Sequence, residues 1–226
     1  MKLAAILFDA YGTLLDVLSV SDLAEQLLPG SSVALSRLWR DKQLQYTWLR
    51  TRSDRYEDFA QVTADALDYA LRSLGLSLSG PDRARLLSQY EHLTAFADAA
   101  PALEALRAST GPALAVLSNG TPALLEAAFT NAGLRQHFAA LLSVDAARRF
   151  KPSPAAYQTA ADHFGAAPSE LLLVSSNGWD VAGAASFGFR TFWVNRAGAP
   201  VERLGVEPDG IGKSLHDLQG WLASDD

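Results

Sequence analysis

Hydrophobic and polar positions along the chain follow two periodicities. Short, continuous apolar runs bounded by polar residues or glycine are typical of strands buried in a parallel sheet, and longer stretches with one apolar face are typical of helices. The strand pattern occurs at residues 3–8, 113–117, 171–174 and 191–194, and more weakly at 140–144. The helical pattern fills the stretches between these runs, at residues 101–109, 122–132, 154–164 and 179–187.

This alternation of strand and helix predicts an α/β fold with a Rossmann-like parallel sheet and helices on both faces. Residues 17–95 interrupt the alternation, because they contain amphipathic helical stretches at 32–51, 56–74 and 81–90 and no strand pattern. An all-helical insertion directly after the first strand predicts a cap over the edge of the sheet. We therefore expect a Rossmann-like core of residues 1–16 and 96–226 and a helical cap of residues 17–95.

Polar side chains follow the predicted strands at the points where the strands end. Ligands of open α/β sheets bind outside the carboxyl ends of the strands, so these side chains should gather at one edge. They would supply a carboxylate nucleophile, hydroxyl and amide donors, a cation and a second carboxylate: Asp9, Thr13, Ser118, Asn119, Lys151, Ser175, Asn177 and Asp180.

Each of these residues taken alone also fits an ordinary structural role. Asp9 fits a turn former or a helix N-cap, and Ser118 with Asn119 fits a turn. Lys151 fits a solvated loop lysine, and Asp180 fits an acid that stabilises the positive end of the following helix. The coincidence of four such segments at strand ends favours a functional site over separate structural roles.

Composition and charge narrow the classes of partner. The chain has 226 residues, 49% of them hydrophobic, which is enough for a well-buried core. Its net charge is −6 and it has no basic stripe, so we expect no nucleic-acid partner. There is no cysteine, and the apolar runs are shorter than a membrane span, so we expect no disulfide and no membrane partner. The N-terminal apolar run leads directly into "FDAYGTL" and is interpreted as a strand, which favours a cytoplasmic location.

Five segments together resemble the haloacid dehalogenase superfamily, and within it the L-2-haloacid dehalogenases. "FDAYGTL" resembles the nucleophile motif, "LSNG" the second motif, "KPSPAAY" the lysine motif and "SSNGWD" the fourth. In the helical insertion, "LWRDKQLQYTWLR" resembles the segment that carries a functional arginine in these dehalogenases, here Arg40. Many phosphatases share the first motif, whereas Tyr11, Arg40 and "SSNGWD" together are specific for the dehalogenase branch.

The resemblance implies a metal-independent enzyme without a cofactor. Superfamily phosphatases carry a second aspartate two positions after the nucleophile, where it serves as acid/base and helps to bind Mg²⁺. Tyr11 stands at that position here, and "SSNGWD" lacks the acidic pair that completes the metal site. Without Mg²⁺ a phosphate dianion would meet Asp9 unscreened, whereas Lys151 can hold a substrate with a single carboxylate charge.

The implied reaction is hydrolytic dehalogenation of short (S)-2-haloalkanoic acids, including haloacetates, to 2-hydroxy acids. Asp9 displaces halide from C2 with inversion and becomes esterified, and water then hydrolyses the aspartyl ester. This activity is that of an (S)-2-haloacid dehalogenase, a hydrolase acting on carbon–halide bonds. Cleavage of fluoroacetate would require a tighter halide pocket, which the sequence does not define.

The resemblance also gives the charged residues their roles. Arg40 and Asn119 would bind and stabilise the leaving halide, because a guanidinium and an amide in a dry pocket favour developing negative charge. Lys151 would hold Asp9 ionised and balance the charges brought into the site. Asp180 would activate the hydrolytic water. A surface position on a helix is the alternative for Arg40.

The remaining predicted site residues orient these groups or line the pocket. Ser175 and Asn177 would position Asp180, while Thr13 and Ser118 would orient Asp9 and the substrate carboxylate. Tyr157 has a site role in the family, and packing of its helix on the sheet is the alternative. The resemblance places four residues in an apolar wall, for which a core position is the alternative: Tyr11, Leu44, Phe59 and Trp179. Asp41 follows Arg40, and because adjacent helical residues do not share a face we expect Asp41 to point away.

Two other functions remain open on the sequence. A magnesium-dependent phosphatase of the same superfamily would lose activity in EDTA and turn over p-nitrophenyl phosphate, although Tyr11 and Asn177 argue against it. A non-catalytic protein that binds a small carboxylate would keep its ligand affinity after Asp9→Asn. The expected partners are a small 2-haloacid and a halide ion, and the family is commonly dimeric, so we expect a homodimer.

Overall fold

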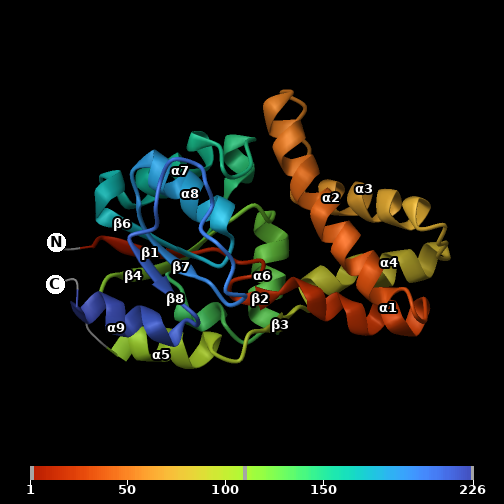
Figure 1. The fold of residues 1–226 in the computed structure, drawn as a ribbon, viewed down its shortest axis with the longest axis horizontal. Helices are drawn as coiled ribbons and strands as arrows, with labels where there is room; N and C mark the ends of the chain where they lie inside the picture. Colours follow the sequence, from red (N-terminus) through yellow and green to blue (C-terminus); the bar gives the residue numbers. More distant parts are fainter. Residues whose placement is uncertain (1–2, 109–110, 225–226) are drawn as a thin grey trace.

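A parallel sheet forms the centre of the protein in the computed structural model, which describes residues 3–108 and 111–224 (Figure 1). Its six strands run in the order β5-β4-β1-β6-β7-β8, and every neighbouring pair is parallel. The strands are β1 (Ala5–Phe8), β4 (Ala113–Ser118), β5 (Ala140–Ser143), β6 (Leu171–Ser175), β7 (Arg190–Val194) and β8 (Gly210–Gly212). The predicted α/β fold is thus confirmed. The pattern missed β8, because three residues that include two glycines carry no strand signal.

Helices cover both faces of this sheet. The helices α7 (Pro154–Phe164) and α8 (Gly178–Phe187) lie on one face, and α5 (Ala99–Ala108) and α9 (His216–Ser224) lie on the other (Figure 1). The helix α6 (Pro122–Asn131) begins after Thr121, whose hydroxyl accepts from Leu124 N at 3.3 Å, followed by a proline at the first helical position. The sequence predicted α5 to α8 but not α9. The last residue of the predicted helix 101–109 lies outside the described residues.

The insertion after β1 is helical. It consists of η1 (Val17–Val20), α1 (Ser21–Leu27), α2 (Ser32–Arg52), α3 (Phe59–Ser73), α4 (Gly80–Ser88) and η2 (Gln89–Glu91), and it is called the helical cap below. The helix α3 begins later than predicted, because the Asp58 carboxylate accepts from Gln61 N and caps the helix there. The short strands β2 (Leu15–Asp16) and β3 (Thr94–Ala95) pair antiparallel where the chain enters and leaves the cap.

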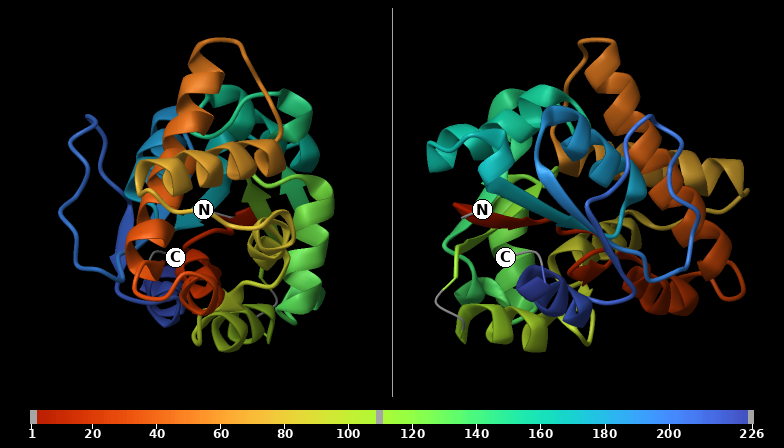
Figure 2. Two further views of the ribbon diagram at one scale, coloured as in Figure 1. Left: turned by 90° about the vertical axis from the view of Figure 1, so that its right-hand side faces the viewer. Right: turned by 60° about the vertical axis from the view of Figure 1, so that its left-hand side comes forward.

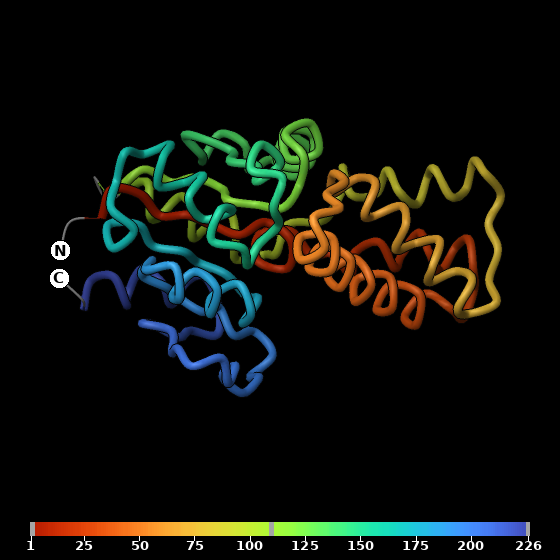
Figure 3. The backbone as a smooth tube through the Cα atoms, turned by 90° about the horizontal axis from the view of Figure 1, so that it is seen from above, coloured from red at the N-terminus to blue at the C-terminus, as the bar shows by residue number. Residues whose placement is uncertain are grey.

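The helical cap stands beyond the carboxyl ends of the strands, and both chain termini lie at the opposite end (Figures 1 and 3). Seen from the cap side, α2 and α3 cross in front of the sheet, and the segment between β7 and β8 projects as a long loop (Figure 2). Among the described residues, no helix is both long enough and apolar enough to cross a membrane.

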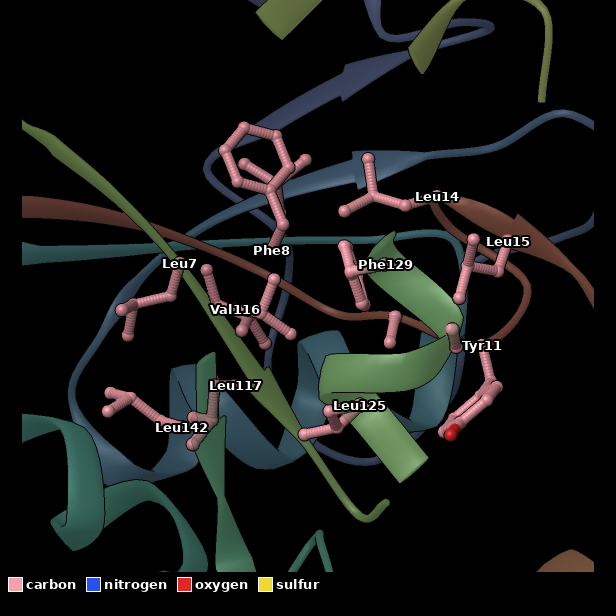
Figure 4. Close-up of a cluster of buried hydrophobic side chains, with 14 of the residues drawn as sticks. Leu7, Phe8, Tyr11, Leu14, Leu15, Val116, Leu117, Leu125, Phe129 and Leu142 are labelled. Carbon is pink, nitrogen blue, oxygen red and sulfur yellow. The ribbon is translucent and has the colours of Figure 1, made fainter. Parts of the chain in front are cut away.

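An apolar cluster fixes the strand ends that carry the polar residues (Figure 4). Phe8 from β1 and Val116 from β4 are fully buried in it, as are Leu125 and Phe129 from α6. Tyr11 lies at the edge of this cluster, on the loop that follows β1. Because such interiors are close-packed, the loop after β1 is held on a rigid base.

Candidate active site

Asp9 lies at the carboxyl end of β1, between two neighbouring strands. Phe8 is paired with Val116 of β4 on one side and with Val174 of β6 on the other. The Asp9 N–H donates to Val174 O at 3.0 Å, so β6 also holds the first residue beyond the strand. Side chains that follow β4 and β6 therefore meet on either side of the Asp9 carboxylate.

A tight turn after Asp9 brings Thr13 back onto its carboxylate. Gly12 has a φ of +92°, which L-residues rarely adopt, so glycine is required at this position. The Thr13 hydroxyl accepts from Ser176 N at 2.8 Å and donates to Asp9 Oδ2 at 2.9 Å. Because the backbone N–H fills its acceptor position, the hydroxyl is oriented to donate to Asp9.

Both oxygens of the Asp9 carboxylate accept hydrogen bonds in a site that leaves this residue 4% exposed. Asn177 Nδ2 donates to Oδ2 at 2.7 Å, and Ser175 Oγ lies farther from the same atom, at 3.5 Å. Lys151 Nζ donates to Oδ1 at 2.8 Å. A turn former would need none of these partners, so the geometry favours a functional carboxylate over the structural alternative.

Lys151 is a buried cation between two carboxylates. Its side chain is 1% exposed, and Nζ lies 2.8 Å from Asp9 Oδ1 and 2.7 Å from Asp180 Oδ2. Nζ also donates to Leu117 O at 3.0 Å, which satisfies its third donor. The prediction that Lys151 holds the substrate carboxylate is therefore corrected, because its three donors already have partners within the protein. Burial alone would lower the pKa of Lys151, but the charges of Asp180 and Asp9 outweigh burial and raise this pKa. The side chain is not the solvated loop lysine of the structural alternative.

Asp180 is fully buried at the start of α8 and has two fixed partners. Lys151 Nζ contacts Oδ2, and the Tyr157 hydroxyl donates to Oδ1 at 2.9 Å. The prediction that Ser175 and Asn177 position Asp180 is corrected, because both of these side chains contact Asp9 instead. Burial raises the pKa of Asp180, the Lys151 ammonium opposes this rise, and the charge of Asp9 adds to it, so that the pKa is raised overall. Burial, followed by the charge of Asp180, raises the pKa of Tyr157 well above its usual value, so Tyr157 remains a hydrogen-bond donor.

Ser118 and Asn119 hold the loop after β4. Asn119 Oδ1 accepts from Lys151 N at 2.9 Å, and this contact leaves the amide nitrogen of Asn119 free to point elsewhere. Ser118 Oγ accepts from Gly120 N at 3.2 Å and helps to shape the turn. The structure thus joins Asn119 to Lys151 by a hydrogen bond to the lysine backbone. The orienting role expected for Ser118 stays a prediction.

The helical cap contributes Arg40, from α2. Its Nη2 donates to Tyr11 O at 3.3 Å, and its Nη1 donates to Gln43 Oε1 at 2.7 Å. Arg40 is thus held beside the loop that carries Asp9 and is half-buried, unlike a free surface arginine. Asp41 is exposed, as predicted from helical geometry.

Aromatic residues from both parts of the chain pack next to the site. The ring of Tyr11 stacks on Phe59 of the cap with centroids 5.1 Å apart, and both side chains are buried. Trp179 contacts Trp48 of α2 edge-on at 5.6 Å, across the junction between cap and core. Leu44 is half-buried on α2, and its place in the apolar wall stays a prediction.

A crevice of about 480 Å³ opens between the cap and the core, and none of the predicted site residues lines it. Phe150 and Pro152, the neighbours of Lys151 in the chain, line it together with Trp48 and Thr51 of the cap. Phe150 N donates to Thr51 Oγ1 at 3.0 Å, so the same residues also hold the two parts together.

Sequence reasoning missed three residues that support the site. Gln43 and Tyr90 are buried in the cap and bonded to each other, with Tyr90 Oη 3.3 Å from Gln43 Oε1. Gly183 packs directly against Tyr157 and Pro152, and a Cβ there would lie 2.5 Å from Pro152 Cβ. No local signal identified Gln43, because a polar residue on a helix such as α2 fits its solvated face. The glycine in α8 was the signal for a close approach.

Gly120→Ala is expected to displace Tyr11. The added Cβ would lie 2.7 Å from Tyr11 Oη and 3.0 Å from Leu125 Cδ2, distances that require one side chain to move. We expect destabilisation of roughly 1–3 kcal/mol by overpacking, measured as the free energy of unfolding in urea. Gly220→Ala is the matched control, because nothing lies within 4 Å of a Cβ there. Equal stability of the two variants would contradict the close contact.

The described side chains were compared with the ligand groups that a metal ion requires. Within residues 3–108 and 111–224, no group of three or more histidine, aspartate or glutamate residues is arranged to hold a metal ion. The ammonium of Lys151 instead lies between the two site carboxylates, Asp9 and Asp180. A reaction independent of metal stays a prediction that experiment must test.

Known proteins share both the sequence and this arrangement. The model of the haloacid dehalogenase-like hydrolase family matches residues 3–188. An (S)-2-haloacid dehalogenase from Pseudomonas putida is 40% identical over 223 residues, 99% of this chain and 98% of the relative. A crystal structure of an L-2-haloacid dehalogenase aligns with a TM-score of 0.95 and 46% identity over 99% of this chain and 100% of the other. The L-2-haloacid dehalogenase from Xanthobacter autotrophicus with chloropropionic acid covalently bound aligns at 0.93, with 39% identity and 100% of both chains covered.

Proposed function

Since the chain belongs to the haloacid dehalogenase-like hydrolase family, we propose that it is an (S)-2-haloacid dehalogenase that converts short 2-haloalkanoic acids to 2-hydroxy acids. The observation that carries this proposal is the position of Lys151 Nζ, 2.8 Å from Asp9 and 2.7 Å from Asp180. One carboxylate is thus available as nucleophile and the other as base, with a fixed cation between them. The covalent chloropropionate adduct of the related Xanthobacter enzyme supports an ester intermediate.

In the first step, Asp9 attacks C2 of the haloacid, and the carbon–halogen bond breaks as the carbon–oxygen bond forms. Thr13 and Asn177 donate to Oδ2, whereas Lys151 is the donor to Oδ1. We therefore assign Oδ1 as the attacking oxygen, because it has fewer donors. Displacement in line inverts C2, so an (S)-2-haloacid gives an (R)-2-hydroxy acid.

The halide that leaves carries the electron pair of the broken bond. Arg40 from the cap and the amide nitrogen of Asn119 are the donors proposed to stabilise its charge. Arg40 is bonded to Tyr11 O, on the loop that follows Asp9. Asn119 is bonded to the backbone N–H of Lys151, the residue whose ammonium contacts Asp9. Donors held in place before the reaction need no reorganisation as charge develops, so they lower the barrier.

In the second step, water attacks the carbonyl carbon of the Asp9 ester. Asp180 takes the proton of this water, and its pKa, raised by burial, suits a base better than an ordinary aspartate. After attack through Oδ1, Oδ2 is the ester carbonyl oxygen, and the Thr13 and Asn177 donors on it stabilise the oxyanion. Collapse of this intermediate breaks the bond between the Asp9 carbonyl carbon and Oδ1, and the proton held by Asp180 passes to the departing alkoxide, which leaves as the hydroxy acid. The new carboxyl group of Asp9 then loses its remaining proton to solvent, which restores the carboxylate.

We propose different roles for the two parts of the chain. Residues 1–16 and 96–226 form the catalytic core, and residues 17–95 form the cap that supplies Arg40 and the wall residue Phe59. We also propose a cytoplasmic homodimer. The resemblance to a family that is commonly dimeric supports this assembly.

A halide-release screen tests the proposed function. The substrates are chloroacetate, bromoacetate, fluoroacetate and both enantiomers of 2-chloropropionate, each with and without EDTA. We expect turnover of the haloacetates and of (S)-2-chloropropionate, conversion of the latter to (R)-lactate, and no effect of EDTA. Turnover that requires added Mg²⁺, turnover of p-nitrophenyl phosphate, or no turnover of any haloacid would contradict the proposal.

A further inference from the structure

We propose that Gln43 is a positioning residue that holds the Arg40 guanidinium toward the leaving halide while leaving its charge uncompensated. The inference rests on the proposed function, because it concerns the departure of halide in that reaction. Gln43 lies one helical turn after Arg40 on α2 and is 0% exposed. Its Oε1 accepts from Arg40 Nη1 at 2.7 Å.

The orientation of the Gln43 amide is determined by its surroundings. Thr63 Oγ1 donates to Phe59 O at 2.6 Å, so this hydroxyl is left to accept from Gln43 Nε2, which lies 2.6 Å away. The amide nitrogen therefore faces α3, and the carbonyl oxygen faces Arg40 and Tyr90. A buried amide that is bonded at both ends is held rigidly, because breaking either bond would leave a polar group unsatisfied.

The partners of Arg40 are neutral oxygens. Nη1 bonds Gln43 Oε1, and Nη2 bonds Tyr11 O. Within the described residues, no carboxylate lies in ion-pair distance of Arg40, whereas other arginines are paired: Arg50 with Asp65, Arg83 with Asp68 and Arg196 with Asp98. A neutral acceptor fixes the guanidinium without cancelling its positive charge. That charge is what a departing anion requires.

A glutamate at position 43 would add a charge and keep the shape of the side chain, but it would replace the Nε2 donor with an oxygen, so that the Thr63 hydroxyl would have to donate to it in place of Phe59 O. The glutamate would pair with Arg40 by charge-assisted hydrogen bonds and compensate its charge. Chloride is a poorer leaving group than bromide, and its departure depends more strongly on stabilisation. A loss of charge at Arg40 should therefore slow dechlorination more than debromination.

The competing explanation is purely structural. Gln43 also accepts a hydrogen bond from Tyr90 and donates one to Thr63 of α3. Its replacement would remove these bonds between α2 and its neighbours and could simply loosen the cap. A loosened cap would slow both halides by the same factor. The dependence on the leaving group separates the two explanations.

The test compares wild type, Gln43→Glu and Gln45→Glu on (S)-2-chloropropionate and (S)-2-bromopropionate. Gln45 is exposed two residues further along α2, so Gln45→Glu adds the same charge away from Arg40. The quantity measured is kcat/KM, which reports steps up to halide departure. Both substrates leave the same ester on Asp9, so single-turnover hydrolysis of this ester is an internal control.

We expect Gln43→Glu to lower kcat/KM roughly 30-fold for the chloride and roughly 5-fold for the bromide, with ester hydrolysis and Gln45→Glu unchanged. Equal losses for both halides, or no loss, would overturn the inference. Gln43→Met removes the acceptor without adding charge, and it should lower both values by loosening Arg40. If neither variant folds by circular dichroism, Gln43 is a structural residue and the inference fails.

A second readout does not require turnover. The rise in Tm caused by sodium bromide, compared with sodium gluconate at equal ionic strength, reports halide binding. We expect this rise in the wild type and in Gln45→Glu, and its loss in Gln43→Glu. Wild-type protein that binds bromide but dehalogenates nothing would refute the proposed function, whereas an unchanged rise in Gln43→Glu would refute the role of Gln43.

Discussion

Asp9→Asn should abolish haloacid turnover without unfolding the protein. The asparagine amide keeps the shape of the side chain but has no anionic oxygen to displace halide, so we expect kcat to fall on the order of 10⁴-fold or more. Halide release from (S)-2-chloropropionate measures the loss, and circular dichroism with thermal unfolding measures the fold.

The matched control is Asp22→Asn, which makes the same chemical change at an exposed position on α1. This variant should retain the activity of the wild type. Retention of more than about a tenth of the activity by Asp9→Asn would contradict a covalent role for the carboxylate. Spontaneous deamidation to aspartate restores activity slowly, so intact mass must be checked before and after the assay.

Lys151→Met should destabilise the protein and inactivate it. Removing the buried ammonium leaves Asp9 and Asp180 close together without the cation that contacts both. Loss of one partner from a buried ion pair costs about 3–5 kcal/mol, because the remaining charge is uncompensated. The free energy of unfolding in urea measures this cost, and Lys213→Met, at an exposed position, is the control.

The destabilisation of Lys151→Met should grow with pH. Burial already raises the pKa of Asp180, and the variant lacks the ammonium that opposes the rise. A carboxyl group whose pKa is higher in the folded than in the unfolded state binds its proton more tightly when folded, so stability falls as pH rises. In the wild type the raised pKa of Lys151 keeps its contribution intact until alkaline pH. A cost for Lys151→Met that is equal at pH 5 and pH 8 would contradict this account.

The sheet could be predicted from the sequence because its strands are buried on both faces and appear as continuous apolar runs. The order of the strands could be predicted only indirectly, from the expectation that the polar residues after the strands form one site. In the structure β1 lies between β4 and β6, so the residues that follow these three strands meet. Edge strand β8 and helices α1 and α9 were not predicted, and they have only three, seven and nine residues. Segments this short carry little periodicity.

The candidate site was predictable where a residue follows a strand and harder to predict in the cap. Asp9, Asn177 and Lys151 converge because the topology brings strand ends together. Gln43 lies on α2, where a polar residue looks like part of a solvated face, and only its packing against Thr63 reveals that it is buried. Such contacts between helices depend on how α2 and α3 cross, which no local pattern encodes.

The most direct test of the account is a single turnover in heavy-oxygen water with enzyme in excess over (S)-2-chloropropionate, followed by mass spectrometry of the peptide containing Asp9 and of the lactate. Because water attacks the ester carbonyl, we predict that the heavy oxygen enters the Asp9 carboxylate and that the first lactate released carries none. Heavy oxygen in that lactate, with Asp9 unlabelled, would show that water displaces the halide directly and would contradict the aspartyl ester.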